Sequence, residues 1–183
     1  MKVIFFIILS LSTLSGCAPI LPGMPSMVVK TYPFNPAGKM ILIQHFDFNP
    51  EIATNVDRSS VQKFGEVIAF DIRNYLSRAG FKYPVVVQAA EPFEGGDFLI
   101  IGTITRVSGG NVQQRRYLEL FGFGATEVMA VGEVIDIKTS TSLVGFSFTK
   151  RSHYTWKNNE AAVRENIREI AQEIAKVIVQ SKK

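Results

Sequence analysis

Three β-type runs follow one another in the second half of the chain, and this succession constrains the fold more than any other feature. Residues 97–107 and 126–137 alternate apolar and polar side chains over much of their length, and residues 143–154 set Val144, Phe146 and Phe148 against small or polar neighbours. Alternation with period two is typical of strands that bury one face, and no helical pattern separates these runs. The succession predicts an antiparallel meander.

Two amphipathic helices are expected, one before the meander in the sequence and one after it. The first runs from about Ser60 to Ala79, and its apolar residues recur at intervals of three or four: Val61, Phe64, Ile68, Ile72 and Leu76. Ser59 with Gln62 has the form of a capping box, and Gly80 suits the left-handed position after a helix. The second helix begins after Asn158 or Asn159, and its apolar stripe consists of Val163, Ile167, Ile170, Ile174 and Val177 or Ile178.

Two shorter β-type runs, at 39–46 and 83–89, stand before and after the first helix. The order of elements is therefore β-α-β-β-β-β-α. We expect an α+β fold with a single sheet of about five strands, mostly an antiparallel meander, and two helices packed on one face of it.

The N-terminus has the pattern of an export signal. Lys2 precedes an apolar run from Val3 to Leu14, which at ~1.5 Å per residue is too short to cross a hydrocarbon core of ~30 Å. The residues Leu-Ser-Gly-Cys that end at Cys17 resemble the bacterial lipobox, in which an apolar and two small residues precede a lipid-modified cysteine. We expect cleavage between Gly16 and Cys17 and acylation of Cys17. The alternative is a buried free cysteine behind an ordinary secretory signal.

The lipobox predicts both the division of the chain into three parts and its location in the cell. We expect residues 1–16 to be a lipoprotein signal peptide, 17–38 a lipidated cysteine with a proline-rich tether, and 39–183 a single α+β domain. Ala18 follows the cysteine, which under enterobacterial sorting rules sends a lipoprotein to the outer membrane, facing the periplasm. In a cell without that membrane, the expected place is the extracytoplasmic face of the cell membrane.

The charge pattern argues against a nucleic-acid-binding protein, and the single cysteine argues against a disulfide-stabilised fold. The formal net charge is +4, yet the basic residues form only short pairs such as Arg115-Arg116. Because the chain is also expected to be exported, we expect no nucleic acid partner. Because the single cysteine is expected to carry lipid, no disulfide within the chain is expected, and the fold must depend on its apolar core.

The sequence gives no positive sign of an enzyme. His45 and Asp47 are two residues apart and would share one face of a strand, but His153 is the only other histidine, so we expect no metal site and no cofactor. We interpret the pair as the polar end of a strand, and Asp71 as part of a solvated helix face. The motifs of serine hydrolases, phosphate-binding loops and zinc proteases are missing from the sequence. An active site without a motif is the remaining alternative.

The connection at 107–126 is the unusual segment, because a two-residue turn is enough to join two strands. It holds a Gly-Gly-Asn turn signal, two arginines and several large apolar residues. In one interpretation these residues extend the strands and cover the core. In the other they project as a hairpin that binds a partner or touches a membrane. The candidate contact residues are Arg115, Arg116, Tyr117, Phe121 and Phe123.

Four short motifs resemble a family of bacterial lipoproteins known as domain of unknown function 4410. They are Gly102-Thr103-Ile104, Arg116, Gly122-Phe123-Gly124, and Asp136 before a turn, although the usual Thr-Gly of that turn is replaced here by Thr-Ser. The element order is also similar to domains of penicillin-binding-protein activator lipoproteins, the curli secretion lipoprotein and the TolB N-terminal domain. These resemblances imply a protein-binding domain of the cell envelope.

We therefore expect a membrane-anchored, non-enzymatic envelope lipoprotein whose periplasmic domain binds another envelope protein. The first alternative is self-assembly into a ring or channel for secretion or assembly, with the chain as a homo-oligomer. The second is an enzyme that acts on peptidoglycan or lipid, which would require His45, Asp47 and His153 to converge.

Overall fold

The computed structural model describes residues 26–30, 32–89, 95–118, 124–152 and 158–181. Gly16 and Cys17, with the expected signal peptide, lie outside these residues. No helix of the described part is long and apolar enough to span a bilayer.

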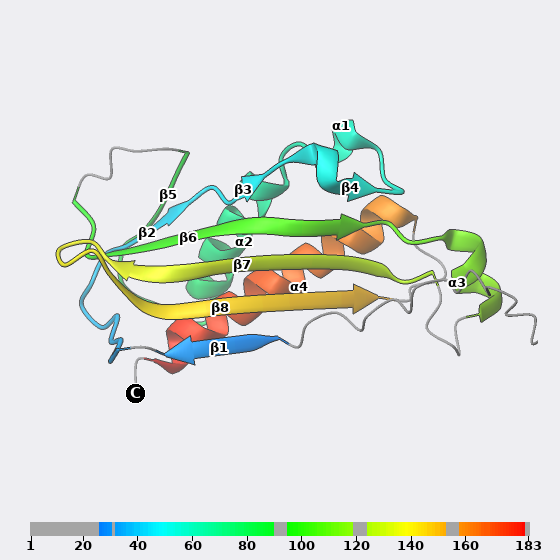
Figure 1. The fold of residues 1–183 in the computed structure, drawn as a ribbon. Coiled ribbons are helices and arrows are strands. Elements are labelled where there is room, and N and C mark those ends of the chain that lie inside the picture. Colours follow the sequence, from blue (N-terminus) through cyan, green and yellow to red (C-terminus); the bar gives the residue numbers. More distant parts are fainter. Residues whose placement is uncertain (1–25, 31, 90–94, 119–123, 153–157, 182–183) are drawn as a thin grey trace, which may run out of the picture.

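One mixed sheet forms the centre of the fold (Figure 1), with eight strands among the described residues in the order β1-β8-β7-β6-β2-β5, while β3 and β4 also pair with β6. The strands are β1 Met27–Lys30, β2 Ile41–Gln44, β3 Asp47–Phe48, β4 Ala53–Thr54, β5 Val85–Gln88, β6 Phe98–Ser108, β7 Thr126–Asp136 and β8 Thr141–Ser152. The α+β class is confirmed.

The meander is confirmed, because β6, β7 and β8 pair antiparallel in sequence order. The expectation of about five mostly antiparallel strands is wrong, because β2 pairs parallel with both β5 and β6. The chain passes from β2 to β5 through a helix, which is the ordinary way to join parallel neighbours. Residues 41–43 are buried on both faces of the sheet, as is typical of parallel strands.

Two long helices, α2 (Phe64–Arg78) and α4 (Asn159–Gln180), pack together on one face of the sheet (Figure 1). Asn158 caps α4, since its side chain accepts a hydrogen bond from the amide of Ala161. The expected capping box is wrong: a separate turn, α1 (Arg58–Val61), begins there, and Asp57 caps it by accepting from the amide of Ser59. Gly80 has φ of +74°, as expected after a helix.

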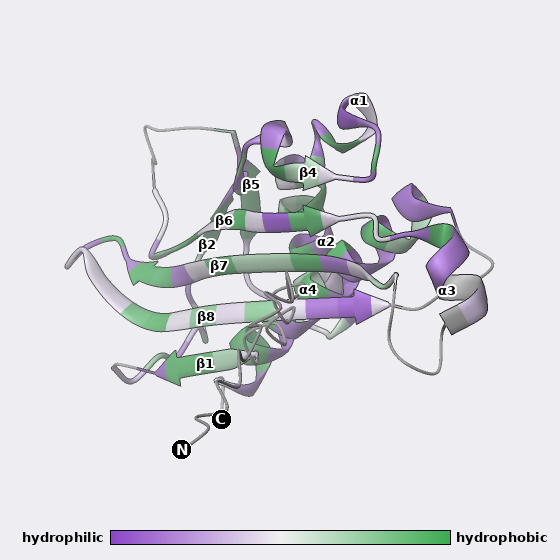
Figure 2. Cartoon of the chain, turned by 45° about the vertical axis from the view of Figure 1, so that its right-hand side comes forward, coloured by the Kyte–Doolittle hydropathy of each residue, from purple (hydrophilic) through white to green (hydrophobic). Residues whose placement is uncertain are grey.

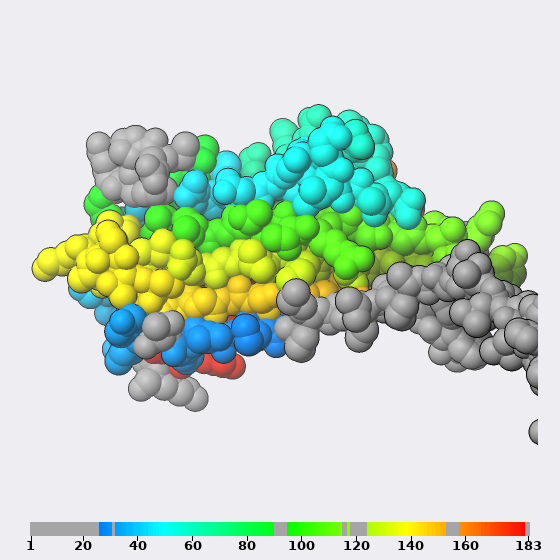
Figure 3. All heavy atoms as spheres, viewed as in Figure 1, coloured from blue at the N-terminus to red at the C-terminus, as the bar shows by residue number. Residues whose placement is uncertain are grey.

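The opposite face of the sheet carries neither of the long helices and is called here the open face. It is turned toward the viewer in Figure 3, where atoms of β6, β7 and β8 lie at the surface. Figure 2 shows that β1 is hydrophobic and that the C-terminal end of β8 is hydrophilic. The open face therefore changes character along its length.

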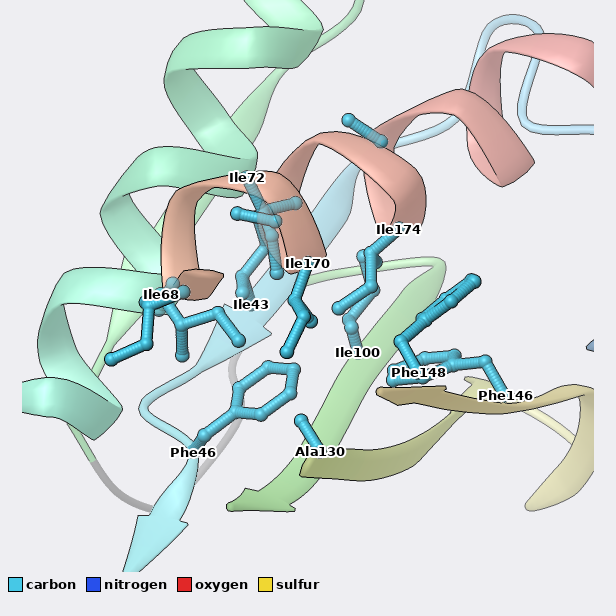
Figure 4. Packing of buried hydrophobic residues seen from close by; sticks show 14 of the residues in the cluster. Ile43, Phe46, Ile68, Ile72, Ile100, Ala130, Phe146, Phe148, Ile170 and Ile174 are labelled. Atoms are coloured by element: carbon cyan, nitrogen blue, oxygen red, sulfur yellow. The ribbon is translucent and has the colours of Figure 1, made fainter. Parts of the chain in front are cut away.

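The core lies between the sheet and the two helices (Figure 4). Ile68 and Ile72 of α2 and Ile170 and Ile174 of α4 meet aromatic residues from the strands, and all four isoleucines are essentially inaccessible to solvent. Burying a side chain of this size contributes ~1.5–3 kcal/mol relative to leaving it exposed. Together these residues provide the apolar core on which the fold depends, as expected from a sequence with a single cysteine.

Several short elements were not expected from the sequence. β3 and β4 continue the line of β2 along β6, and each has only two residues. The third element is the short helix α3 (Val112–Leu118), within the connection between β6 and β7. In addition, β1 lies inside the segment expected to be a tether and pairs with β8, so residues 27–30 are part of the sheet.

Candidate functional site

The end of the sheet where β6 and β8 stop and β7 begins is marked by Ser108, Ser152 and Thr126, and is called here the α3 end. The chain reaches the sheet from this end. β1 runs antiparallel to β8, with Met27 opposite Ser147 and later residues progressively farther from the α3 end. Met27, at the N-terminal end of β1, is therefore the residue of this strand nearest to the α3 end (Figure 1).

Helix α3 occupies the middle of the connection at 107–126. Asn111 starts the helix, since its side chain accepts a hydrogen bond from the amide of Gln114, and the Asn111 amide donates to Gly124. Gly110 has φ of +64°, so the expected turn at Gly-Gly-Asn is present. Residues 112–118 are thus neither strand extensions nor the arm of a hairpin, the two arrangements considered from sequence.

The candidate contact residues are only partly described by the structure. Residues 115 and 116 lie in α3, and the Tyr117 side chain is 84% exposed, the largest exposure of any large hydrophobic side chain in the described part. Phe121 and Phe123 lie outside the described residues. An exposed aromatic ring at one end of a sheet is a feature found at protein and membrane contacts, where one edge of the ring stays wet.

A charged cluster on the open face lies at the same end. Arg106 of β6 and Arg151 of β8 flank Glu127 of β7, which pairs directly with Arg151. The Arg106 Nε forms an ion pair with one carboxylate oxygen of Glu127 at 3.0 Å, and the Arg151 Nε donates a hydrogen bond to the other. The Glu127 side chain is 9% exposed, whereas those of Arg106 and Arg151 are 53% and 36% exposed. One nearly buried carboxylate therefore holds two guanidinium groups at the surface.

A polar network on the helix face fixes the same strand ends. The Thr126 and Ser152 hydroxyls are 2.6 Å apart, and the fully buried Asn166 of α4 donates to the Thr126 hydroxyl at 3.0 Å. This network ties the start of β7 and the end of β8 to α4. The strand ends that carry Glu127 and Arg151 are therefore held in place from behind.

A hollow of about 500 Å³ lies farther along the open face. Its apolar walls include Met27, Val131 and Ile101, and Gly145 contributes no side chain where there is open space. His45 and Asp47 both line it, so they do share a face, as their spacing predicted. Within the described part of the chain no group of three or more histidine, cysteine or acidic residues is placed to hold a metal ion. His153 lies outside the described residues.

Asp71 is less solvated than the sequence suggested. It faces α4, where its Oδ2 atom is buried without a hydrogen-bond partner among the described residues. This burial raises the pKa of its carboxyl group, although the positive charges of Arg168, Arg164 and Arg78 act in the opposite direction. The interpretation as part of a solvated helix face is therefore wrong for this residue.

The comparisons with known proteins concern the fold alone. No family model matches the chain, so the expected membership of the domain of unknown function 4410 family finds no support there, and no curated protein matches it. Among solved structures, PelC of Paraburkholderia phytofirmans, crystallised as a dodecamer, has a TM-score of 0.53 at 14% identity over 80% of this chain and 96% of that one. The chain shares its fold with PelC.

Two further neighbours have similar coverage. Protein XCC0632 of Xanthomonas campestris, of the family DUF330, has a TM-score of 0.54 at 9% identity over 83% of this chain and 94% of its own. Lipoprotein GNA1162 of Neisseria meningitidis has a TM-score of 0.43 at 15% identity over 78% of this chain and 95% of its own. The TM-scores above 0.5 show that the chain shares its fold with PelC and XCC0632.

The sequence did not indicate Arg106, Glu127 and Arg151. They lie on three different strands and meet only because of the register of the meander. A bulge between Ile104 and Arg106 decides which face Arg106 occupies. The hydrophilic end of the run at 143–154 was the one feature of the sequence that could have indicated a charged cluster at this end of the sheet.

Proposed function

We propose that this chain is a lipid-anchored envelope lipoprotein whose domain binds another envelope protein through α3 and its flanking residues. The acyl chains are attached at Cys17 after cleavage behind Gly16, and in a Gram-negative cell the domain faces the periplasm from the outer membrane. The observation that supports this proposal is the position of the exposed Tyr117 at the end from which the chain reaches the sheet.

The distance from the anchor is short. Cys17 precedes Ser26 by nine residues (26 − 17 = 9). At ~3.3–3.6 Å per residue, Ser26 stays within ~32 Å of the acylated residue. Ser26 is bound at Thr149, three residues (152 − 149 = 3) from the end of β8, so the α3 end stays within ~43 Å. The partner is therefore a protein in the same membrane or at its surface, and the contact residues are Arg115, Arg116, Tyr117, Phe121 and Phe123.

A photocrosslinking residue in place of Tyr117 tests this function in intact cells. We expect it to capture one defined envelope protein, while a crosslinking residue in place of Thr139, in the turn at the opposite end of β7 and β8, captures none. Capture of the same protein from both positions, or none from 117, contradicts the proposal. In parallel, Cys17→Ser should prevent palmitate labelling and release the protein from membranes.

A second candidate function is self-assembly into a ring. Two features favour it: among the described strands, β1 and β5 stand at the edges of the sheet and each pairs with one neighbour, and PelC is a dodecamer. When two different edges of one molecule pair head to tail, the contact closes into a ring or continues as a filament. Light scattering of the acylated protein in mild detergent tests this arrangement, and a monomeric mass contradicts it.

A further inference from the structure

Beyond the protein contact, we propose that Arg106 and Arg151 bind the phosphate group of an anionic phospholipid in the membrane that anchors the chain. The inference rests on the proposed acylation of Cys17, because the anchor brings this end of the sheet to the membrane. Helix α3 then contacts the partner protein, and the two arginines on the open face contact the lipid.

The geometry of the cluster prepares both arginines for a second ligand. Glu127 uses its two oxygens to bind the Nε atoms of Arg106 and Arg151, one each. A guanidinium group has five N–H donors in a planar fork, so the terminal amino groups of both side chains remain. Among the described residues these amino groups have no hydrogen-bond or ion-pair partner within reach.

The charges of the cluster do not cancel. Two guanidinium groups and one carboxylate leave a net charge of one positive unit, and the negative charge is the buried one. The forked donors match the oxygens of a phosphate group, which accept two parallel hydrogen bonds from one arginine. The Glu127 side chain is only 9% exposed, so a cation beside it is needed for stability. One guanidinium group is enough to balance its charge, so stability alone does not account for the second arginine.

The path of the chain places this cluster beside the anchor. The Ser26 hydroxyl exchanges hydrogen bonds with the backbone of Thr149, at 3.4 Å to its carbonyl and 3.3 Å from its amide. Thr149 and Arg151 are two residues apart on β8 and thus point to the same face of the sheet. Ser26, nine residues after Cys17, is therefore bound two residues along β8 from Arg151, and this short spacing from the proposed anchor favours a lipid over an acidic segment of a protein partner as the ligand.

The size of the effect follows from the attraction between a basic side chain and an anionic membrane, which is ~1 kcal/mol for each lysine or arginine. Two arginines correspond to ~2 kcal/mol. At 1.36 kcal/mol per tenfold change, this is about a 30-fold shift toward the membrane-contacting orientation of the domain.

A spin label at position 105 tests the inference in the acylated protein. Thr105 is exposed beside Arg106, and after acylation of Cys17 the Thr105→Cys variant has one free thiol. The labelled protein is reconstituted in vesicles of phosphatidylcholine alone and in vesicles that also contain phosphatidylglycerol. The measurement is the collision rate of the label with a water-soluble nickel complex. Thr139→Cys, in the turn at the far end, is the position control.

We expect the label at 105 to be protected only in the vesicles with phosphatidylglycerol, and Arg106→Gln/Arg151→Gln to remove that protection. Lys63→Gln/Arg73→Gln removes the same amount of charge from exposed positions outside the cluster, and the label at 105 should remain protected in this variant. Equal accessibility in both kinds of vesicle, or protection that survives in the Arg106/Arg151 variant, overturns the inference.

The same samples separate the inference from the proposed function. Mass spectrometry of the reconstituted protein first establishes whether Cys17 carries acyl chains. If it does not, the proposed function fails. If it does and the label stays accessible, only the lipid site fails. Protection by an acidic peptide in phosphatidylcholine vesicles, without an effect of phosphatidylglycerol, would assign the arginines to a protein ligand and also overturn the lipid site.

Discussion

Gly65→Ala is expected to destabilise the protein by about 2 kcal/mol, although alanine is the better helix former. Gly65 is the second residue of α2, and its carbonyl accepts a hydrogen bond from the amide of Phe46 at 3.0 Å. A Cβ atom at Gly65 would overlap the Phe46 carbonyl oxygen, which is backbone and has no rotamer to change. The first turn of α2 must therefore move away from the sheet.

Three terms decide the magnitude. Alanine contributes at most ~1 kcal/mol of helix propensity. Against this stand a weakened hydrogen bond, ~0.5–1.5 kcal/mol, and forced displacement in a packed core, ~1–3 kcal/mol. The net loss of about 2 kcal/mol corresponds to a fall in Tm of ~4–8 °C for a domain of this size.

Thermal and urea unfolding measure this loss, and Gly145→Ala is the matched control. A Cβ atom at Gly145 meets nothing within 4 Å and projects from a strand into open space. We expect its free energy of unfolding to stay within ~0.5 kcal/mol of the parent. If Gly65→Ala is as stable as the parent, the close approach of α2 to Phe46 is not a constraint on the fold and the reasoning is refuted.

Three other variants probe charged and polar groups by urea unfolding. Burial raises the pKa of the Asp71 carboxyl group, so its contribution to stability is present below the ordinary pKa of 3.8 and is lost as pH rises through the pKa in the folded protein. Asp71→Asn should therefore be more stable than the parent at pH 7, and the difference in the free energy of unfolding should shrink in acid. The hydrogen bond from the amide of Met40 lowers the pKa of the Asp97 carboxyl group. The contribution of Asp97 to stability is therefore present above the ordinary pKa of 3.8 and is lost as pH falls through the pKa in the folded protein, so Asp97→Asn should be less stable than the parent at pH 7. A reversed sign in either case contradicts the cause given. Asn166→Ala should cost ~1–3 kcal/mol, because it removes the buried donor to the Thr126 hydroxyl; no loss would mean that the network does not hold the strand ends.

The helices and long strands were predictable because their signals are local. The apolar stripe that includes Ile68 and Ile72 repeats over several turns, and the alternation in β7 and β8 extends over eleven or twelve residues. A two-residue strand such as β3 has no period to detect. Parallel pairing of β2 with β5 and β6 also has no local signal, since it depends on which strand edges meet after the α2 crossover.

The charged cluster was hidden by one irregularity. Counted by twos from the buried Ile104, Arg106 would point into the core, beneath the helices. The bulge between these residues reverses the alternation, so that Val107 is buried and Arg106 reaches the open face beside Glu127. The position of a bulge depends on the pairing of two strands, so the sequence of one strand cannot reveal it.

The edge strand β1 is the place at which the N-terminal part of the chain joins the sheet. All four of its residues are exposed, so it adds little to the core, yet it fixes the direction from which the chain meets the sheet. Without this pairing the N-terminal part of the chain would have no fixed point of contact with the sheet, and the proposed anchor would favour no face of the domain toward the membrane. With it, Ser26 is hydrogen-bonded to Thr149, two residues along β8 from Arg151. The main contribution of β1 is therefore orientation, and the proposed protein and lipid contacts both depend on it.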